Sequence, residues 1–171
     1  MRGILPVLHS DTEVLAALES DSAKIISAPP SYPFLIALKA QQHPVLVVTS
    51  SSRSAEDLAE SLRDLHSRVY EFPAWETLPH ERLSPRSDTV AQRIATLYSL
   101  QLSEATHPVV VAPVRAVIHR FIASLATKPL WTLEIGQEIG LTELITHLTE
   151  LAFTRTDLVE KRGEFAVRGG I

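Results

Sequence analysis

Short apolar runs of strand length alternate with amphipathic runs of helix length over most of the chain. The runs "PVLVVTS" (44–50) and "PVVVAP" (108–113) are the clearest, because they are short and rich in valine. An apolar run without polar alternation is typical of a strand that is covered on both faces. Strands that alternate with helices pair in parallel through crossovers, so we predict an α/β protein with a doubly wound, mostly parallel sheet.

The other predicted elements continue this alternation. Asp11 is expected to cap a first helix, and the serines of "TSSSRS" (49–54) are expected to cap a later one. Further strands are predicted at 24–28, 68–72 and 131–136, and further helices at 52–66, 88–100 and 114–125 and from residues 31 and 142. The apolar face of the helix at 88–100 consists of Val90, Ile94, Leu97 and Tyr98.

The composition changes near residue 153. Residues 153–171 carry four basic and three acidic side chains, a net charge of +1, whereas residues 1–152 carry 12 and 17, a net charge of −5. We therefore predict an α/β domain at 1–152 and the first strands of a small β-rich domain at 153–171. Because the chain stops after two glycines and an apolar residue, we expect it to be a piece of a longer protein.

Composition excludes several classes of function. The formal net charge of −4 at pH 7 gives no indication of the basic surface that binds nucleic acid. The chain has no cysteine, which excludes disulfides, thiolate zinc sites and cysteine nucleophiles and fits a reducing cytoplasm. No stretch approaches the ~20 apolar residues of a membrane span. We expect a cytoplasmic protein that does not bind a membrane.

The stretch "KIISAPPSYPFLIALKA" (24–40) has the strand, turn and helix layout of a phosphate-binding site. Such a turn needs glycines, whose backbone N–H groups converge on the phosphates, and a lysine where the helix begins. Here the turn has no glycine, Pro29, Pro30 and Pro33 each remove an N–H donor, and no lysine lies at the start of the helix. We therefore predict that this turn does not bind a nucleotide.

No other catalytic arrangement is visible in the sequence. None of the seven histidines lies at a metal-binding spacing such as HxxxH or HExxH. The GxSxG motif of a nucleophilic serine does not occur. The sequence therefore predicts no catalytic residue, no bound cofactor and no metal site.

An aromatic stretch among prolines is more specific. The segment "EFPAWETLPHERLSPRSD" (71–88) places Phe72, Trp75 and Leu78 between prolines. This pattern favours a loop that buries its aromatic side chains over the edge of the sheet. The alternative hypothesis is a loop that recognises a partner.

The C-terminal stretch "RGEFAVRGGI" (162–171) contains the one candidate binding residue. Strand alternation places Phe165 and Val167 on one face and Arg168 on the other. The two glycines after Arg168 leave its guanidinium unobstructed. Arg168 is by default a solvated strand arginine, and the alternative is an anchor that binds a partner.

Three segments carry a resemblance to a known family. They are "FPAWETLPHERLSPRSDTVAQRIATLYSL" (72–100), "VVVAPVRAVIHR" (109–120) and "DLVEKRGEFAVRGGI" (157–171). With the order of the elements between them, they resemble the N-terminal region of the bacterial transcription-repair coupling factor (Mfd) family. That region is similar to the excision-repair protein UvrB, a helicase-like α/β domain interrupted by a small β domain that recruits UvrA. The resemblance implies that 24–40 holds a decayed phosphate loop and that 73–87 is too short for UvrB's DNA-inserting hairpin.

The resemblance also implies a function. It implies a non-catalytic adaptor that recruits UvrA to stalled RNA polymerase in transcription-coupled nucleotide-excision repair, with Arg168 on the UvrA-binding surface. It further implies that this chain contacts other domains of the same protein. Contacts with RNA polymerase and DNA, and the use of ATP and magnesium, belong to parts absent from this chain. The alternative function is that of a divergent nucleotide-binding or ATPase domain that binds phosphate through a loop other than 28–33.

Overall fold

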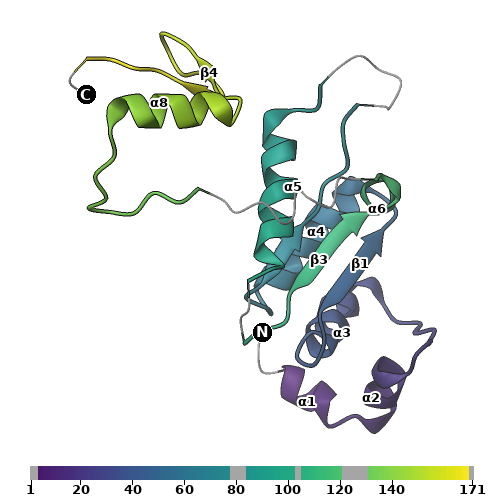
Figure 1. Ribbon diagram of the computed structural model, residues 1–171. Coiled ribbons are helices and arrows are strands. Elements are labelled where there is room, and N and C mark those ends of the chain that lie inside the picture. Colours follow the sequence, from purple (N-terminus) through teal and green to yellow (C-terminus); the bar gives the residue numbers. More distant parts are fainter. Residues whose placement is uncertain (1–3, 78–83, 103–104, 121–130, 170–171) are drawn as a thin grey trace. The chain divides into compact units, whose positions relative to one another are not determined.

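The computed structural model describes residues 4–77, 84–102, 105–120 and 131–169, in two compact units (Figure 1). The N-terminal unit comprises Met1–Thr127 and the C-terminal unit comprises Lys128–Ile171. The change in composition placed the predicted boundary after residue 152, whereas the two units divide before helix α8 (Leu141–Glu150). Helix α8 is therefore grouped with the C-terminal strands and not with the parallel sheet.

The N-terminal unit is a mixed α/β domain. Its elements are α1 (Leu5–His9), α2 (Thr12–Glu19), the 3₁₀ helix η2 (Pro29–Ser31), α3 (Tyr32–Lys39), β1 (Val45–Thr49), α4 (Ser52–Arg63), β2 (Val69–Glu71), α5 (Ser87–Ser99), β3 (Val109–Pro113) and α6 (Val114–Ile118). From β1 onward this order confirms the predicted alternation of strands and helices.

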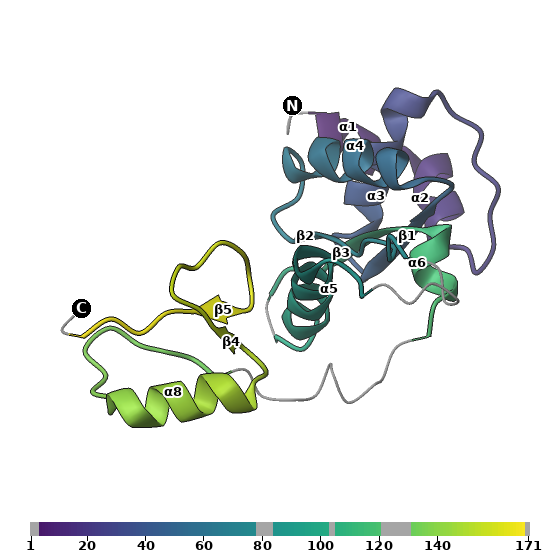
Figure 2. The ribbon, with the colours of Figure 1, turned by 90° about the horizontal axis from the view of Figure 1, so that it is seen from above.

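The three strands form a parallel sheet in the order β1–β3–β2. Val109 lies opposite Val45 on one side and opposite Val69 on the other. Helices α3 and α4 lie on one side of the sheet, and α5 lies on the opposite side (Figure 2). An α/β domain with a parallel sheet is thus confirmed. A doubly wound, helicase-like sheet stays a prediction, because the described sheet consists of these three strands.

The main core lies between the sheet and helices α3 and α4. It contains alanines from both helices, Leu62 of α4, and Val109 and Val111 of the central strand. Alanine side chains allow the helices to approach the strands closely. Complete burial of Leu62, Val109 and Val111 stabilises the fold by roughly 1.5–3 kcal/mol each.

Strand β1 differs from the prediction of a strand covered on both faces. Val45 and Val47 pack against the main core, but Leu46 and Val48 are 58% and 49% exposed. The reason is that β1 is an edge strand of the described sheet, and α5 packs against β2 at the other edge. The prediction was therefore wrong for one of the two faces of β1.

Two predicted strands are not formed. Residues 24–28 belong to no strand ladder, and the side chain of Ile26 is 86% exposed. Within 131–136 the backbone turns instead, because the N–H of Gln137 donates to the carbonyl oxygen of Glu134 at 3.2 Å and Gly136 has a φ of 89°. Strand propensity is realised only where a neighbouring strand completes the hydrogen bonds, and neither segment has such a neighbour among the described strands.

The helix caps follow the prediction. One carboxylate oxygen of Asp11 accepts hydrogen bonds from the N–H groups of Glu13 and Val14, at 3.0 and 3.2 Å. The hydroxyl of Ser51 accepts from the N–H of Ser54 at 3.1 Å at the start of α4. These bonds satisfy backbone donors that have no partner within the helix.

Helix α6 ends at Ile118, before the predicted end at residue 125, and the segment 121–130 lies outside the described residues. In the described part of the chain, no helix has the length and apolar character that crossing a membrane requires.

The C-terminal unit contains α8 and the strands β4 (Thr154–Arg155) and β5 (Glu164–Phe165). The two strands pair in parallel, with Thr154 opposite Glu164. Two short strands joined near Arg162 and Gly163 were predicted; two strands are present, but they are parallel, residues 156–163 connect them, and β5 ends at Phe165. Before α8, the ring of Trp131 packs on the ring of His147 with a centroid distance of 4.1 Å.

Candidate functional site

The turn at residues 28–33 occupies the place of a phosphate loop but lacks its donors. The N–H of Ser31 donates to the carbonyl oxygen of Ala28 at 2.9 Å, and the N–H of Tyr32 donates to the carbonyl oxygen of Pro29. Residues 29, 30 and 33 are prolines and have no N–H group. Every backbone donor from residue 29 to residue 33 is therefore missing or already engaged.

The cavity beside this turn is also unfavourable for an anion. It has a volume of about 660 Å³ and lies between the proline turn and α4. Its charged lining residues are Asp57 and Asp64, and none of its lining residues is Lys or Arg. A phosphate group there would meet two carboxylates and no cation. Across the described residues, no three His, Cys, Asp or Glu side chains are grouped so that they could hold a metal ion.

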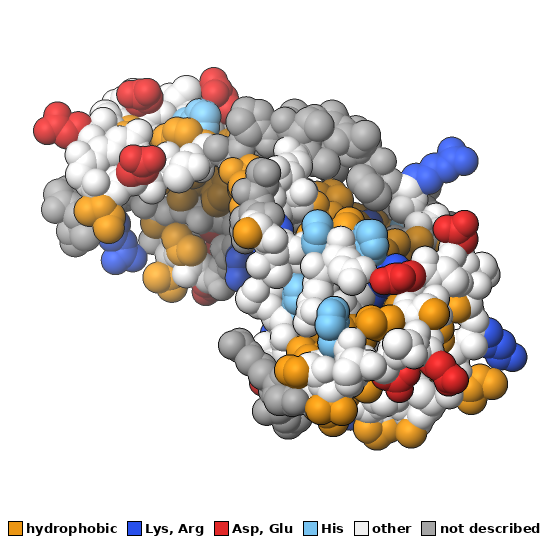
Figure 3. All heavy atoms as spheres, turned by 90° about the horizontal axis from the view of Figure 1, so that it is seen from below, with side chains coloured by type: hydrophobic (Ala, Val, Ile, Leu, Met, Phe, Trp, Pro, Cys, Tyr) orange, Lys and Arg blue, Asp and Glu red, His pale blue; other side chains and the backbone are white. Residues whose placement is uncertain are grey.

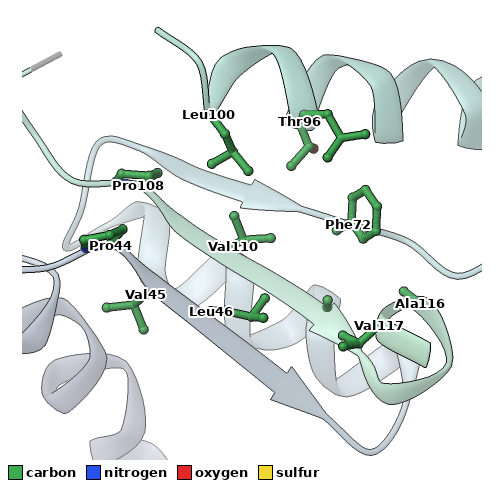
Figure 4. A pocket seen from close by; sticks show the side chains of 12 residues that line it. Pro44, Val45, Leu46, Phe72, Thr96, Leu100, Pro108, Val110, Ala116 and Val117 are labelled. Carbon is green, nitrogen blue, oxygen red and sulfur yellow. The ribbon is translucent and has the colours of Figure 1, made fainter. Parts of the chain in front are cut away.

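An apolar groove lies on the face of the sheet that carries the exposed side chain of Leu46 (Figure 4). Its volume is about 350 Å³, and its walls include Leu46, Val110, Leu97 and Val117. Thr96 is the one polar lining residue, and its hydroxyl already donates to the carbonyl oxygen of Glu71 at 2.9 Å. The groove therefore suits apolar groups and contains no group for acid–base or nucleophilic chemistry. Hydrophobic side chains also reach the surface between polar ones in a space-filling view (Figure 3).

Arg93 of α5 holds the aromatic stretch in place. Its side chain is 2% exposed, and its Cζ atom lies 3.9 Å from the ring centroid of Phe72 and 4.3 Å from that of Trp75. Its Nη1 donates to the carbonyl oxygen of Pro73 at 2.6 Å. Burial lowers the pKa of the Arg93 guanidinium. The two ring faces and the carbonyl replace part of the water that the cation loses, while its Nη2 is buried with no hydrogen-bond partner among the described residues.

The segment 71–88 was interpreted as a loop that buries its aromatic side chains, and the structure confirms this for both aromatic residues named, Phe72 and Trp75. Phe72 is buried and Trp75 is half-buried. Leu78 lies outside the described residues.

Sequence reasoning missed the buried face of α5. The structure buries Thr89, Arg93 and Thr96, while the predicted face of Val90, Ile94, Leu97 and Tyr98 is half-buried. The hydroxyl of Thr89 donates to the carboxylate of Glu76, so this helix face satisfies polar groups of the aromatic stretch. The only available signal was the spacing of these three residues, which places them on one face of a helix.

Arg168 is exposed, but it lies beyond the end of β5 at Phe165, so its place on a strand face opposite Phe165 stays a prediction. Phe165 is buried, Val167 is half-buried, and Arg168 is exposed. One contact holds the arginine, since its Nη2 donates to the carbonyl oxygen of Asp157 at 3.1 Å. A Cβ added at the next residue, Gly169, would meet no atom within 4 Å.

Comparison with known proteins relates both units to DNA-repair proteins. The family model of the UvrB interaction domain matches residues 131–171. The transcription-repair-coupling factor of Mycobacterium tuberculosis (strain CDC 1551 / Oshkosh) is 44% identical over 156 residues, which is 84% of this chain. That of Escherichia coli (strain K12) is 28% identical over 141 residues, or 80% of this chain. The UvrABC system protein B of Thermobifida fusca (strain YX) is 29% identical over 141 residues, which is 75% of this chain and 20% of that protein. The chain spans 12% of the length of the two transcription-repair-coupling factors.

Proposed function

Because the chain belongs to the transcription-repair-coupling factor family, we propose that it is a non-catalytic adaptor region that recruits UvrA in transcription-coupled nucleotide-excision repair. The observation that carries this proposal is the match of the UvrB interaction domain to residues 131–171, the part that contains the exposed Arg168. An interaction domain that carries an exposed arginine fits a docking role.

Arg168 is the proposed anchor for UvrA. Its guanidinium makes one hydrogen bond among the described residues, to the carbonyl oxygen of Asp157, and a guanidinium carries five N–H donors. It would donate charge-assisted hydrogen bonds to a carboxylate or carbonyl group on UvrA. Such bonds are roughly twice as strong as those between neutral groups, so a single arginine can contribute a large share of the binding free energy.

The geometry of the N-terminal unit supports a role without nucleotide chemistry. From residue 29 to residue 33 every backbone N–H is missing or engaged, and the adjacent cavity presents Asp57 and Asp64 to any anion. In this proposal the α/β unit is a scaffold in the cytoplasm, and ATP with magnesium, RNA polymerase and DNA are bound by other parts of a longer factor.

The proposal is tested by calorimetric titration of UvrA with the chain at fixed salt, using the wild type and Arg168→Glu. We expect the wild type to bind and the charge reversal to weaken binding by at least about 2 kcal/mol, because a buried anchor would be replaced by a repelling charge. Arg115→Glu is the matched control, since Arg115 is an exposed arginine of α6 in the other unit.

Two results would contradict the proposal. If the wild type does not bind UvrA, recruitment of UvrA is the wrong function for this chain. If Arg168→Glu and Arg115→Glu weaken binding equally, the arginine is a solvated residue and the anchor lies elsewhere.

A further inference from the structure

The loop between β4 and β5 is held in one shape by polar side chains. The hydroxyl of Thr156 donates to the carbonyl oxygen of Leu158 at 3.0 Å. One carboxylate oxygen of Glu164 accepts from the N–H groups of Glu160 and Lys161, at 3.0 and 3.2 Å. These bonds fix the middle of the loop against β5 and leave few conformations open to its backbone.

The base of the loop is closed by backbone hydrogen bonds. The N–H of Thr154 donates to the carbonyl oxygen of Gly163 at 2.8 Å, and that of Thr156 donates to Phe165 at 2.9 Å. Gly163 has a φ of 85°, a conformation that a residue with a Cβ rarely adopts. The loop is therefore anchored at both ends as well as in its middle.

Two aliphatic side chains project from this ordered loop into solvent. Leu158 is 63% exposed and Val159 is 51% exposed. Single exposed aliphatic residues are ordinary. These two are adjacent, and the hydrogen bonds on either side order the backbone that carries them. A loop ordered in advance loses little entropy on binding, so such a pair contributes more to affinity than one on a mobile loop.

Arg168 is attached to the same loop. Its hydrogen bond to the carbonyl oxygen of Asp157 links the guanidinium to the residue directly before Leu158. The positive charge and the two aliphatic side chains therefore lie on one connected piece of structure. An apolar contact beside a charged anchor is the composition of an interface hot spot, because the apolar groups exclude water from the charged hydrogen bonds.

We propose that Leu158 and Val159 form the apolar half of the surface that binds UvrA, next to Arg168 as its polar half. This inference rests on the proposed function and deepens it, since it states what UvrA must present. The complementary site on UvrA is an apolar depression with a carboxylate or a group of carbonyl oxygens at its rim. The Arg168 charge favours such a partner over a second copy of this chain, because two copies would bring two guanidinium groups together.

The test is calorimetric titration of UvrA with the whole chain carrying Leu158→Ser and Val159→Ser together. We expect binding at least about tenfold weaker than that of the wild type. The matched control carries Leu133→Ser and Leu141→Ser, because these leucines of the same unit are 57% and 58% exposed. The control is expected to bind within about twofold of the wild type. Circular dichroism of each variant verifies that the fold is kept.

The outcomes separate this inference from the proposed function. If Arg168→Glu weakens binding but the Leu158 and Val159 variant binds like its control, the inference is overturned and the proposed function stands. If the wild type does not bind UvrA, both are overturned. If the double variant changes self-association in sedimentation measurements and not the affinity for UvrA, the pair contacts a second copy and the inference fails.

Discussion

Replacement of Arg93 should destabilise the N-terminal unit by an amount that follows from its contacts. The guanidinium lies between the rings of Phe72 and Trp75 and donates to the carbonyl oxygen of Pro73. Each cation–π contact is worth ~1–2 kcal/mol when it is shielded from water, and a hydrogen bond from a charged donor ~1.5–3 kcal/mol. Burial of the cation costs several kcal/mol and offsets part of this sum. We expect Arg93→Ala to lower the free energy of unfolding by about 2–3 kcal/mol.

A second substitution separates the shape of the side chain from its charge. Arg93→Lys keeps the positive charge, but an ammonium group is not planar and cannot lie flat against both rings. We therefore expect Arg93→Lys to lower the free energy of unfolding by about 1–2 kcal/mol, less than the alanine variant. Arg115→Lys is the control, because Arg115 is exposed on α6 and should change stability by less than about 0.5 kcal/mol.

The assay is urea unfolding followed by tryptophan fluorescence. The chain has two tryptophans, so Trp131→Phe leaves Trp75 as the only reporter, and Trp75 contacts Arg93 directly. If Arg93→Ala costs less than about 0.5 kcal/mol, or if Arg93→Lys is as stable as the wild type, the stacked guanidinium does not hold the aromatic stretch and this reasoning is refuted.

Three further predictions concern the other described features. Ser51→Ala should lower the free energy of unfolding by about 1 kcal/mol in urea, because it removes the acceptor for the N–H of Ser54; no measurable change would show that water replaces the cap. The pKa of Glu164 is held below its usual value by the N–H of Glu160 and by the N–H and ammonium of Lys161. The ionised Glu164 therefore orders the loop fully at any pH above the usual carboxyl pKa, and this order is lost as the pH falls through the lowered pKa. In the wild type, the amide chemical shifts of Glu160 and Lys161 should change with pH as Glu164 titrates, whereas in Glu164→Gln they should stay constant. Identical pH profiles of the two proteins would contradict this prediction. Titration with ATP and magnesium should give no saturable heat, whereas a Kd below about 1 mM, roughly −4 kcal/mol, would contradict the loss of the phosphate loop.

Local signals in the sequence were sufficient for the elements of the parallel sheet. Apolar runs of valine produced β1 and β3, and a leucine face with helical spacing produced α4. The caps at Asp11 and Ser51 were equally readable, because a cap depends on residues within three positions of one another.

Features that depend on distant neighbours were not readable from sequence. Residues 24–28 have strand composition but belong to no ladder of the described sheet, and β1 has an exposed face although its sequence is apolar throughout. Both outcomes depend on which elements pack beside them, and sequence periodicity carries no information about that.

The candidate site divides in the same manner. The sequence by itself determined that Pro29, Pro30 and Pro33 offer no N–H to a phosphate, because proline has no N–H whatever surrounds it, whereas the engagement of the Ser31 and Tyr32 N–H groups came from the structure. The exposure of Arg168 was decided by the structure, because this residue lies three positions beyond the end of β5, where strand alternation no longer fixes the side. Only the tertiary structure decided that Arg93 lies between two aromatic rings, and that the Glu164 carboxylate and the Arg168 guanidinium order the loop carrying Leu158 and Val159. The physical reason is that these contacts join residues from different elements or from the two ends of a loop, and their geometry exists only once the chain has folded.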